Sequence, residues 1–497
     1  MQSIALPQDS FNQQWLAAIA PEDWVNPQPA DCYDLVVVGG GPAGLVAAAG
    51  AAGLGLGLKV ALIERRWLGG DCLNVGCVPS KSLIAAAKVA RSPVEPETFA
   101  AAMAHLRAVR SRLAVHDSAQ RFQGLGVDVF LGEGRFQDPR AIAVGSQTLR
   151  FKKAVIATGT RPHVPPIPGL ATAGSVTNET LFNWVQRPDR LAILGGGPIG
   201  CELAQAFARL GTHVTLIQRR SRLLPRESAA AAAIVQRALE RAGVTVLTGQ
   251  TVTQVNRSPL GCEIQMAQHP AIAVDEILVA TGRSPNVETL NLAAAQVALG
   301  PQGIAVNDFL QTSNPRIFAA GDVCQGDRFT HAADAAARLV LQNALFTPFG
   351  LGKGRWSKVT IPRVTYTDPE VASVGWIDSG EGMSAIGPGP APRLIEVPLS
   401  QVDRAQTDQV AEGCLQVWLA PDRDQILGAT LIAPHAGETI GEIALAMAAG
   451  WGLGRLAKVV HPYPTQAECI KKAADAYRKT QLSDRTRQLL AWLHRWS

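Results

Sequence analysis

Cysteine is scarce in this chain, with 8 residues among 497. So low a content excludes a small secreted fold held together by many disulfides. Only Cys72 and Cys77 stand close together, and no CxxC motif or Cys/His cluster supplies the four ligands of a structural zinc site. We therefore expect no resident metal and a cytoplasmic location, where such a pair is more often catalytic or metal-binding than structural.

Charged tracts and long apolar segments are also lacking. Charged residues make up 18% of the chain and the net charge of +5 is spread along it, so we expect no nucleic-acid partner. Residues 1–30 lack the basic start and apolar core of a signal peptide, which predicts a short N-terminal extension. Glycines and Lys59 interrupt the longest apolar stretch, Gly44–Ile63, which favours a helix followed by a strand over a membrane span.

What the chain does contain is length, apolar residues and glycine. Its 497 residues are several times a domain of about 100 to 200 residues, so about three domains are expected. The 47% hydrophobic content and the 47 glycines favour a globular α/β fold.

Two segments resemble each other, Leu35–Gly44 and Leu191–Gly200. Each reads as a buried strand, a glycine turn, a helix rich in small and apolar residues and a second strand, the order of a βαβ dinucleotide-binding unit. The repeat therefore predicts two Rossmann-like domains that bind two nucleotides.

In the first unit, Gly39, Gly41 and Gly44 let the backbone approach a pyrophosphate at a helix N-terminus, where N–H groups and the helix dipole favour an anion. Glu64 stands twenty residues past Gly44 and is suited to accept hydrogen bonds from ribose hydroxyls. Glycine turns also serve packing alone, but the flanking strands and Glu64 favour a dinucleotide site.

The second unit carries its glycines at Gly195, Gly197 and Gly200. Where an acid selecting the NAD ribose is expected, the chain has Gln218, followed by Arg219. A neutral residue followed by a cation suits a 2′-phosphate, so NADP(H) is predicted, although an arginine here can also simply face solvent.

The segment GGDCLNVGCVPSK, Gly69–Lys81, holds the cysteine pair. Cys72 and Cys77 are five residues apart, so on a helical turn their sulfurs can approach to disulfide distance, and the local dipole can stabilise a thiolate.

This segment, following a first dinucleotide unit, resembles the class I pyridine nucleotide-disulfide oxidoreductases, which include glutathione reductase, dihydrolipoamide dehydrogenase and mercuric reductase. The likeness extends over most of the chain, through the segments VIATGTRP, VATGRSPN, IFAAGDVC and YTDPEVASVGW. The resemblance implies FAD and NADP(H) as cofactors and a homodimer. It also implies an N-terminal extension at 1–30, an FAD domain at 31–168 and 287–350, a NAD(P) domain at 169–286 and a C-terminal α+β dimerisation domain at 351–497.

By the same resemblance, Cys77 is the thiol next to the flavin, where it forms a charge-transfer pair, and Cys72 is the interchange thiol that attacks substrate. Lys81 and Glu202 match a pair that the family places beside flavin N5, although such a pair can also be an ordinary salt bridge between domains. The further cofactor-binding residues implied are Thr158, Gly159 and Asp322, the last beside the ribityl chain.

The C-terminal segment HPYPTQAE matches the place where disulfide reductases carry a His-Glu dyad. Tyr463 stands here in place of the acid-base histidine, with Glu468 as the acid, and an unperturbed tyrosine is a poor base at neutral pH. His461 could substitute as the base, or Tyr463 and Glu468 could simply pack an interface. Mercuric reductase similarly has tyrosine at this position.

The chain is thus interpreted as a mercuric-reductase-like branch that reduces Hg(II), a disulfide or another small acceptor. It lacks the C-terminal vicinal cysteines and the N-terminal CxxC domain of mercuric reductase, and Cys414 and Cys469 are interpreted as core thiols. The alternatives are a dihydrolipoamide dehydrogenase or glutathione-reductase-like enzyme, disfavoured by Tyr463 and Gln218, and a flavin-binding regulatory protein with slow turnover.

Overall fold

The computed structural model describes residues 6–90, 94–259, 261–380 and 391–496, and these divide into two compact units. The first consists of Met1–Gly195, Ala206–Thr215 and Thr251–Val359, and the second of Gly196–Gln205, Leu216–Gln250 and Thr360–Ser497. Among the described residues, no helix is both long and apolar enough to cross a membrane.

The first unit is built around a seven-stranded sheet with the order β3-β2-β1-β6-β5-β4, in which β18 also pairs with β6. The pairs of β1 with β2 and β6, of β2 with β3 and of β6 with β18 are parallel, and β4, β5 and β6 are antiparallel to one another. The strands are β1 (Tyr33–Val38), β2 (Val60–Glu64), β3 (Val127–Leu131), β4 (Gly134–Asp138), β5 (Ala141–Val144), β6 (Gln147–Ile156) and β18 (Ile317–Ala319).

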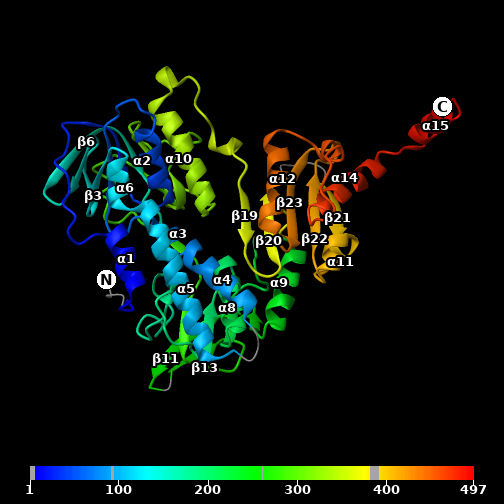
Figure 1. Cartoon of the computed structure of the whole chain (residues 1–497), viewed down its shortest axis with the longest axis horizontal. Coiled ribbons are helices and arrows are strands. Elements are labelled where there is room, and N and C mark those ends of the chain that lie inside the picture. Colours follow the sequence, from blue (N-terminus) through cyan, green and yellow to red (C-terminus); the bar gives the residue numbers. More distant parts are fainter. Residues whose placement is uncertain (1–5, 91–93, 260, 381–390, 497) are drawn as a thin grey trace. The chain divides into compact units, whose positions relative to one another are not determined.

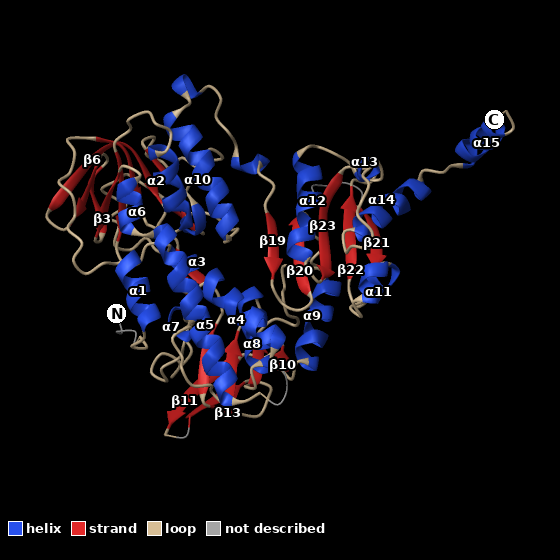
Figure 2. Ribbon diagram, in the orientation of Figure 1, coloured by secondary structure: helices blue, strands red, loops and turns tan. Residues whose placement is uncertain are grey.

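Strand β1 is buried on both faces, as parallel strands covered on both sides usually are. Because side chains alternate along a strand, Leu35 and Val37 enter one hydrophobic core while Val36 and Val38 enter another. Helices α2 (Pro42–Ala52) and α10 (Thr330–Leu345) lie side by side against the first of these cores, as Figures 1 and 2 show. Alanines on both helices allow this close approach.

The apolar stretch that the sequence assigned to a helix followed by a strand forms α2 and β2, which confirms that interpretation. The remaining helices of the unit are α1 (Ser10–Ile19), α3 (Gly70–Asn74), α4 (Cys77–Val89), α5 (Pro96–Ala114), α6 (Ala119–Gly124) and α7 (Asn178–Leu181), with short 3-10 helices at η1 (Val115–Asp117), η2 (Gly321–Val323), η3 (Pro348–Gly350) and η4 (Trp356–Lys358).

The second βαβ segment belongs to a four-stranded sheet with the order β10-β9-β8-β14. Its elements are β8 (Arg190–Leu194), α8 (Pro198–Arg209), β9 (His213–Gln218), α9 (Ala229–Arg241), β10 (Thr245–Thr248) and β14 (Glu276–Val279). Smaller sheets are formed by β7 (Thr160–Pro162) with β15 (Arg283–Pro285), by β11 (Val252–Ser258) with β12 (Gly261–Met266) and β13 (Ile272–Val274), and by β16 (Leu299–Gly300) with β17 (Gly303–Ile304).

The C-terminal part of the second unit has an antiparallel sheet with the order β19-β20-β23-β22-β21. Its core contains Cys469, and Cys414 is also buried, which confirms both as core thiols. The elements are β19 (Pro362–Thr365), β20 (Glu370–Gly375), β21 (Arg393–Pro398), η5 (Leu399–Gln401), α11 (Asp403–Thr407), β22 (Cys414–Leu419), β23 (Ile426–Ala433), α12 (Ala436–Ala448), α13 (Leu453–Leu456), α14 (Glu468–Thr480) and α15 (Asp484–His494).

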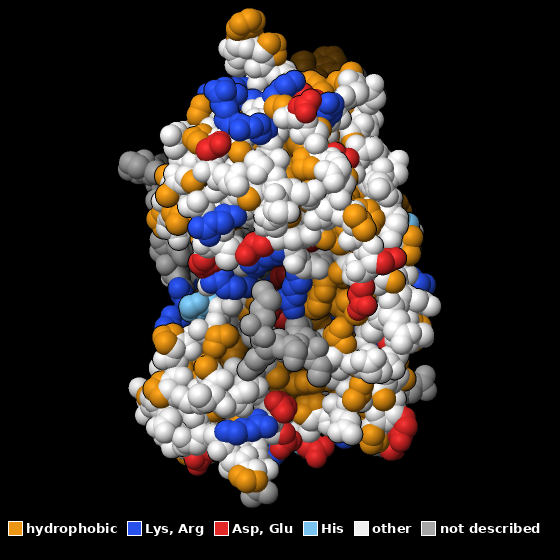
Figure 3. Space-filling view, turned by 90° about the vertical axis from the view of Figure 1, so that its left-hand side faces the viewer, with side chains coloured by type: hydrophobic (Ala, Val, Ile, Leu, Met, Phe, Trp, Pro, Cys, Tyr) orange, Lys and Arg blue, Asp and Glu red, His pale blue; other side chains and the backbone are white. Residues whose placement is uncertain are grey.

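The two Rossmann-like segments and the separate antiparallel sheet confirm the predicted α/β fold class. On the face drawn in Figure 3, side chains of both charge signs are present, as expected for charges spread along the sequence.

Candidate functional site

The first glycine turn joins β1 to α2. Gly39 has a φ of +110°, and a Cβ there would overlap the carbonyl oxygen of Ala157, so only glycine fits. A Cβ at Gly44 would in turn overlap the carbonyl oxygen of Gly39. Gly41 is the N-cap of α2 and gives that end no side-chain cap, which leaves helix N–H groups available to an anion.

Glu64 lies at the end of β2, next to this turn. Its Oε2 accepts a hydrogen bond from Gly40 N at 2.6 Å, and its Oε1 accepts one from Arg66 N at 2.7 Å. Burial raises the pKa of Glu64, whereas these two N–H groups favour the charged carboxylate. The strand therefore places the acid beside the glycine turn, as the sequence predicted.

Thr158 and Gly159 follow β6 and bond to Asn286, far along the chain. Thr158 Oγ1 donates to Asn286 O at 2.7 Å, and Asn286 N donates to Gly159 O at 3.0 Å. Asn286 thus joins the segment after β15 to the segment after β6, a role not expected from the sequence. Gly159 adopts a φ of +63°, which favours glycine.

Asp322 lies in η2 and accepts a hydrogen bond from Thr160 Oγ1 at 3.1 Å. Burial raises the pKa of Asp322, while the charge of nearby Arg283 opposes that shift. Arg283 Nε also donates to Thr160 Oγ1 at 2.6 Å, and its guanidinium pairs with Asp71. Arg283 belongs to the segment VATGRSPN, which the sequence singled out as similar to the family. Its hydrogen-bond and ion-pair partners could not be predicted from that segment.

The cysteine pair does not lie on one helical turn, so that expectation was wrong. Cys72 belongs to α3, which ends at Asn74, and Cys77 is the first residue of α4. The break occurs at Gly76, with φ −130° and ψ −115°, where a Cβ would come within 2.7 Å of Asp71 O. The chain thus turns between the two cysteines instead of continuing as a helix.

Both cysteines are thiols here, in side-chain hydrogen-bond contact. That bond to Cys77 is the largest cause of a raised pKa at Cys72, and burial adds to it. The raised pKa favours the protonated form of Cys72, whereas Cys77 begins a helix, a position that favours a thiolate. Thr330 Oγ1 lies 3.5 Å from Cys77 Sγ and also bonds Cys72, a contact that the sequence did not reveal.

The second glycine turn repeats the geometry of the first. Gly195 has a φ of +112°, and a Cβ there would overlap the carbonyl oxygen of Ala280. Gly197 has open space on its Cβ side just before α8, and Gly200 is buried within that helix.

At the end of β9, Gln218 is buried and its Nε2 donates to Arg222 O at 3.3 Å, so this side chain braces its own loop. Arg219, the next residue, is exposed. An exposed cation that follows the strand is available to a ligand phosphate, and its selectivity stays a prediction.

Lys81 lies on α4 in the first unit and Glu202 on α8 in the second, and their pairing stays a prediction. Glu202 is 5% exposed, and its Oε1 accepts a hydrogen bond from Tyr366 N at 2.9 Å. One turn further along α8, Gln205 bonds both the N–H and the carbonyl of Asp368.

Tyr463 is 71% exposed, and its hydroxyl donates to Asp403 Oδ2 at 2.9 Å. That hydrogen bond raises the pKa of Tyr463 above its ordinary value, so the hydroxyl is a weaker acid and even less tyrosinate is present at neutral pH to act as a base. His461 Nε2 lies 2.8 Å from Glu442 Oε1. Glu468 begins α14 and pairs with Lys472, while its Oε2 is buried without a hydrogen-bond partner among the described residues.

Comparisons with known proteins find matches over most of the chain. A family model described as "Pyridine nucleotide-disulphide oxidoreductase" matches residues 33–337, and the corresponding dimerisation-domain model matches residues 361–474. The mercuric reductase of Staphylococcus aureus is 35% identical over 462 residues, which cover 90% of this chain and 83% of that protein. The dihydrolipoyl dehydrogenase of Thermus scotoductus is 34% identical over 464 residues, which cover 90% of this chain and 98% of that protein.

Among solved structures, the HOCl-induced flavoprotein disulfide reductase RclA from Escherichia coli superposes with a TM-score of 0.79 at 28% identity. That alignment covers 89% of this chain and 99% of RclA.

Proposed function

Because this chain belongs to the pyridine nucleotide-disulphide oxidoreductase family, we propose that it is an NADPH-dependent member that reduces Hg(II) or a similar thiol-binding acceptor. Membership makes it an FAD-dependent disulfide oxidoreductase that uses NAD(P)H. Beyond family membership, we propose that the enzyme prefers NADPH, forms a homodimer and is located in the cytoplasm. We also propose the domain boundaries predicted from the sequence.

The residues of the first unit fit FAD. Gly39 and Gly41 leave a cradle at the uncapped start of α2, and Glu64 lies beside it with a carboxylate suited to a ribose. Asp322 is a half-buried acid, the kind of group that gains from a hydroxyl donor. When bound, FAD supplies the redox chemistry that links a hydride donor to thiols.

The chain itself supplies the thiols and their protonation. The raised pKa of Cys72 favours its protonated form, and Thr330 offers a hydroxyl to both sulfurs. Two adjacent soft sulfur ligands suit a soft metal ion such as Hg(II). Its reduction to Hg(0) takes two electrons, which one NADPH provides as a hydride with net release of one proton.

A metal acceptor is favoured over a disulfide by the state of Tyr463. Cleavage of a disulfide needs a proton for the leaving thiolate, and a tyrosine whose pKa is raised by Asp403 does not exchange protons readily at neutral pH. Within the described residues, no group of three His, Cys, Asp or Glu side chains is placed to hold a metal ion. In this proposal Hg(II) is the substrate.

The test is a set of anaerobic turnover measurements on the FAD-loaded enzyme. With NADPH as donor, we expect rapid flavin bleaching, fast turnover with Hg(II), and slow turnover with glutathione disulfide and lipoamide. Bleaching without turnover on any acceptor would instead favour a regulatory protein. Fast lipoamide turnover with NAD+ and NADH would favour a dihydrolipoyl dehydrogenase, as in the relative from Thermus scotoductus.

Arg219 is expected to determine the choice of nucleotide. Replacing Arg219 by Ala should weaken NADPH by about ten- to a hundred-fold and leave NADH nearly unchanged, because a charge-assisted contact with the 2′-phosphate contributes about 1.5 to 3 kcal/mol. Isothermal titration calorimetry, which does not rely on flavin absorbance, gives the dissociation constants of both nucleotides and checks this. Equal weakening of the two would show that Arg219 does not contact the 2′-phosphate.

A further inference from the structure

Helix α1 lies before residue 33, where the family model begins, yet it is firmly packed into the first unit. Trp15 and Ile19 are fully buried and belong to the same core as β1 and α2. The Trp15 ring lies 4.9 Å from that of Trp67 in an edge-on contact. The extension is therefore an integral part of this unit.

A residue that lies between the two cysteines is hydrogen-bonded to α1. Asn74, which is 1% exposed, accepts a hydrogen bond at its Oδ1 from Trp15 Nε1 at 2.8 Å. Its Nδ2 donates to Leu68 O at 2.9 Å and to Gly70 O at 2.8 Å. The Asn74 side chain thus links α1 to the backbone on which Cys72 is held.

A buried arginine completes the link. Arg110 of α5 donates to Asn74 O at 3.0 Å and to Asn12 Oδ1 at 2.7 Å, and its guanidinium lies 3.9 Å from the centre of the Trp15 ring. Burial lowers the pKa of Arg110 to about 10, so it stays charged at neutral pH. A cation that donates to the last carbonyl of α3 satisfies a group that a short helix cannot pair itself.

We propose that α1 positions the redox segment, with Trp15 and Arg110 as positioning residues for Cys72 and Cys77. The proposal rests on the redox role assigned to the pair. Neither residue touches a sulfur. They fix the C-terminal end of α3, and so the place at which the chain turns toward α4 and brings the two thiols into contact.

Trp15→Phe tests this, because it keeps a buried aromatic ring and removes the Nε1 donor together with part of the ring volume. Leaving Asn74 Oδ1 unpaired should favour local opening of the segment and speed alkylation of Cys72 by iodoacetamide by about 5- to 100-fold. The measurement uses reduced, FAD-loaded full-length enzyme and peptide mass spectrometry. Cys32, partly exposed in the same unit, serves as the internal reference and should react as in wild type.

Arg107→Gln is the matched control. Arg107 pairs with Asp9 at 2.7 Å and so also fastens the extension to α5, and its charge acts on Arg110, but the hydrogen bonds described for Asn74 involve neither Arg107 nor Asp9. At matched global unfolding free energy, it should leave Cys72 reactivity unchanged. If Trp15→Phe does not fold, Asn12→Ala, which removes the Oδ1 acceptor of Arg110 together with the Asn12 hydrogen bond to Pro7 O, should still give a smaller rise. Equal effects of Trp15→Phe and Arg107→Gln, or none in either, would overturn the proposal without affecting the acceptor assignment.

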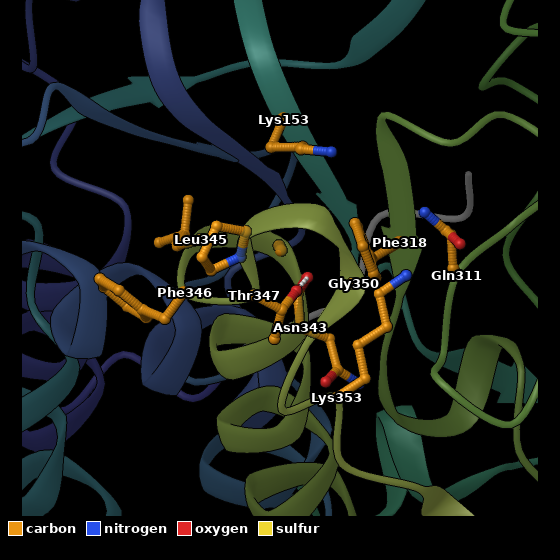
Figure 4. Close-up of a pocket in the computed structure, with 11 residues that line it drawn as sticks. Lys153, Gln311, Phe318, Asn343, Leu345, Phe346, Thr347, Gly350 and Lys353 are labelled. Atoms are coloured by element: carbon orange, nitrogen blue, oxygen red, sulfur yellow. Dashed lines mark hydrogen bonds between the residues drawn. The ribbon is translucent and has the colours of Figure 1, made fainter.

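A second observation concerns a cavity of about 530 Å³ in the same unit. None of the residues assigned to FAD, NADP(H) or the thiols lines it. Figure 4 shows Lys153, from β6, and Lys353, from the loop after η3, at this cavity together with Gln311 and the apolar side chains of Phe318 and Leu345.

The charges around this cavity are of one sign. The pKa of Lys153 is lowered, mainly by burial and further by the positive charges of Arg316 and Lys353. Lys153 Nζ donates to Pro315 O at 3.2 Å, and no described carboxylate forms an ion pair with Lys153, Arg316 or Lys353. Neighbouring Lys152, by contrast, pairs with Asp34 at 2.7 Å.

We infer that this cavity binds a small organic anion with at least two negative charges. Such a ligand would relieve the repulsion between Lys153 and Lys353, accept a hydrogen bond from the Gln311 amide and rest its carbon skeleton on Phe318 and Leu345. Carboxylates and phosphate esters share this chemistry, and the choice of probe separates them.

Calorimetry on the FAD-loaded enzyme with citrate and with phenyl phosphate tests the site. Lys153→Gln and Lys353→Gln should each weaken the better probe by about tenfold. Lys152→Gln should not, because that lysine faces Asp34. Arg219→Ala should bind as wild type, which separates this cavity from the nucleotide site. No binding of either probe, or equal losses in Lys152→Gln, would overturn the inference.

Discussion

Cys72→Ser should show a long-wavelength thiolate-to-flavin absorption band without any reductant, whereas Cys77→Ser should show none in any state. The hydrogen bond to Cys77 raises the pKa of Cys72, and the place of Cys77 at the start of α4 favours a negative charge there, so we expect Cys77 to be the thiolate of the pair. Without Cys72, Cys77 cannot form the disulfide and stays reduced beside the flavin. Absorption spectra of the two FAD-loaded variants at neutral pH check this.

The control for this result is Thr330→Val, which removes the hydroxyl near both sulfurs but no thiol. It should retain the band after reduction. If Cys72→Ser lacks the band while its flavin content is normal, the two thiol roles are reversed.

Tyr463→His should raise turnover with glutathione disulfide or lipoamide by about 10- to 10⁴-fold, the contribution of a positioned general acid-base group. A histidine titrates near neutral pH. The buried Oε2 of Glu468, which has no hydrogen-bond partner among the described residues, could accept a hydrogen bond from this histidine and orient it. Hg(II) turnover should fall, because the tyrosine hydroxyl is lost. Steady-state kinetics with each acceptor measure both changes.

The matched control is Tyr463→Phe, which removes the hydroxyl and its bond to Asp403 without adding a base. Sizing of each variant must accompany the kinetics, since the family carries this segment in a dimerisation domain. Brisk disulfide turnover by the wild type that survives Tyr463→Phe would show that another group supplies the proton. His461, which is held by Glu442, would then be the first to examine.

The glycine turns and the strands around them could be predicted from the sequence because their determinants are local. Gly39 and Gly195 both adopt positive φ against a carbonyl oxygen, and β2 ends at Glu64 where its apolar run ends. Alternating burial of β1 on two faces explains why its sequence reads as a continuous apolar run.

The parts that escaped prediction depend on contacts between distant segments. Thr330 lies 253 positions from Cys77, and Trp15 lies 59 positions from Asn74, so no spacing in the sequence relates them. The break between α3 and α4 was missed for a different reason. Gly76 leaves the helical conformation at a point where the backbone passes close to Asp71 O, and helix propensity alone does not locate that break.

Helix α8 begins beside the open turn at Gly197 and, within the second unit, holds the loop between β19 and β20 through Glu202 and Gln205. Both side chains are buried, so the start of the helix and the 366–368 loop are joined by hydrogen bonds within one compact unit. Replacing either side chain would remove hydrogen bonds to the backbone that leads into β20, far along the chain from the glycine turn.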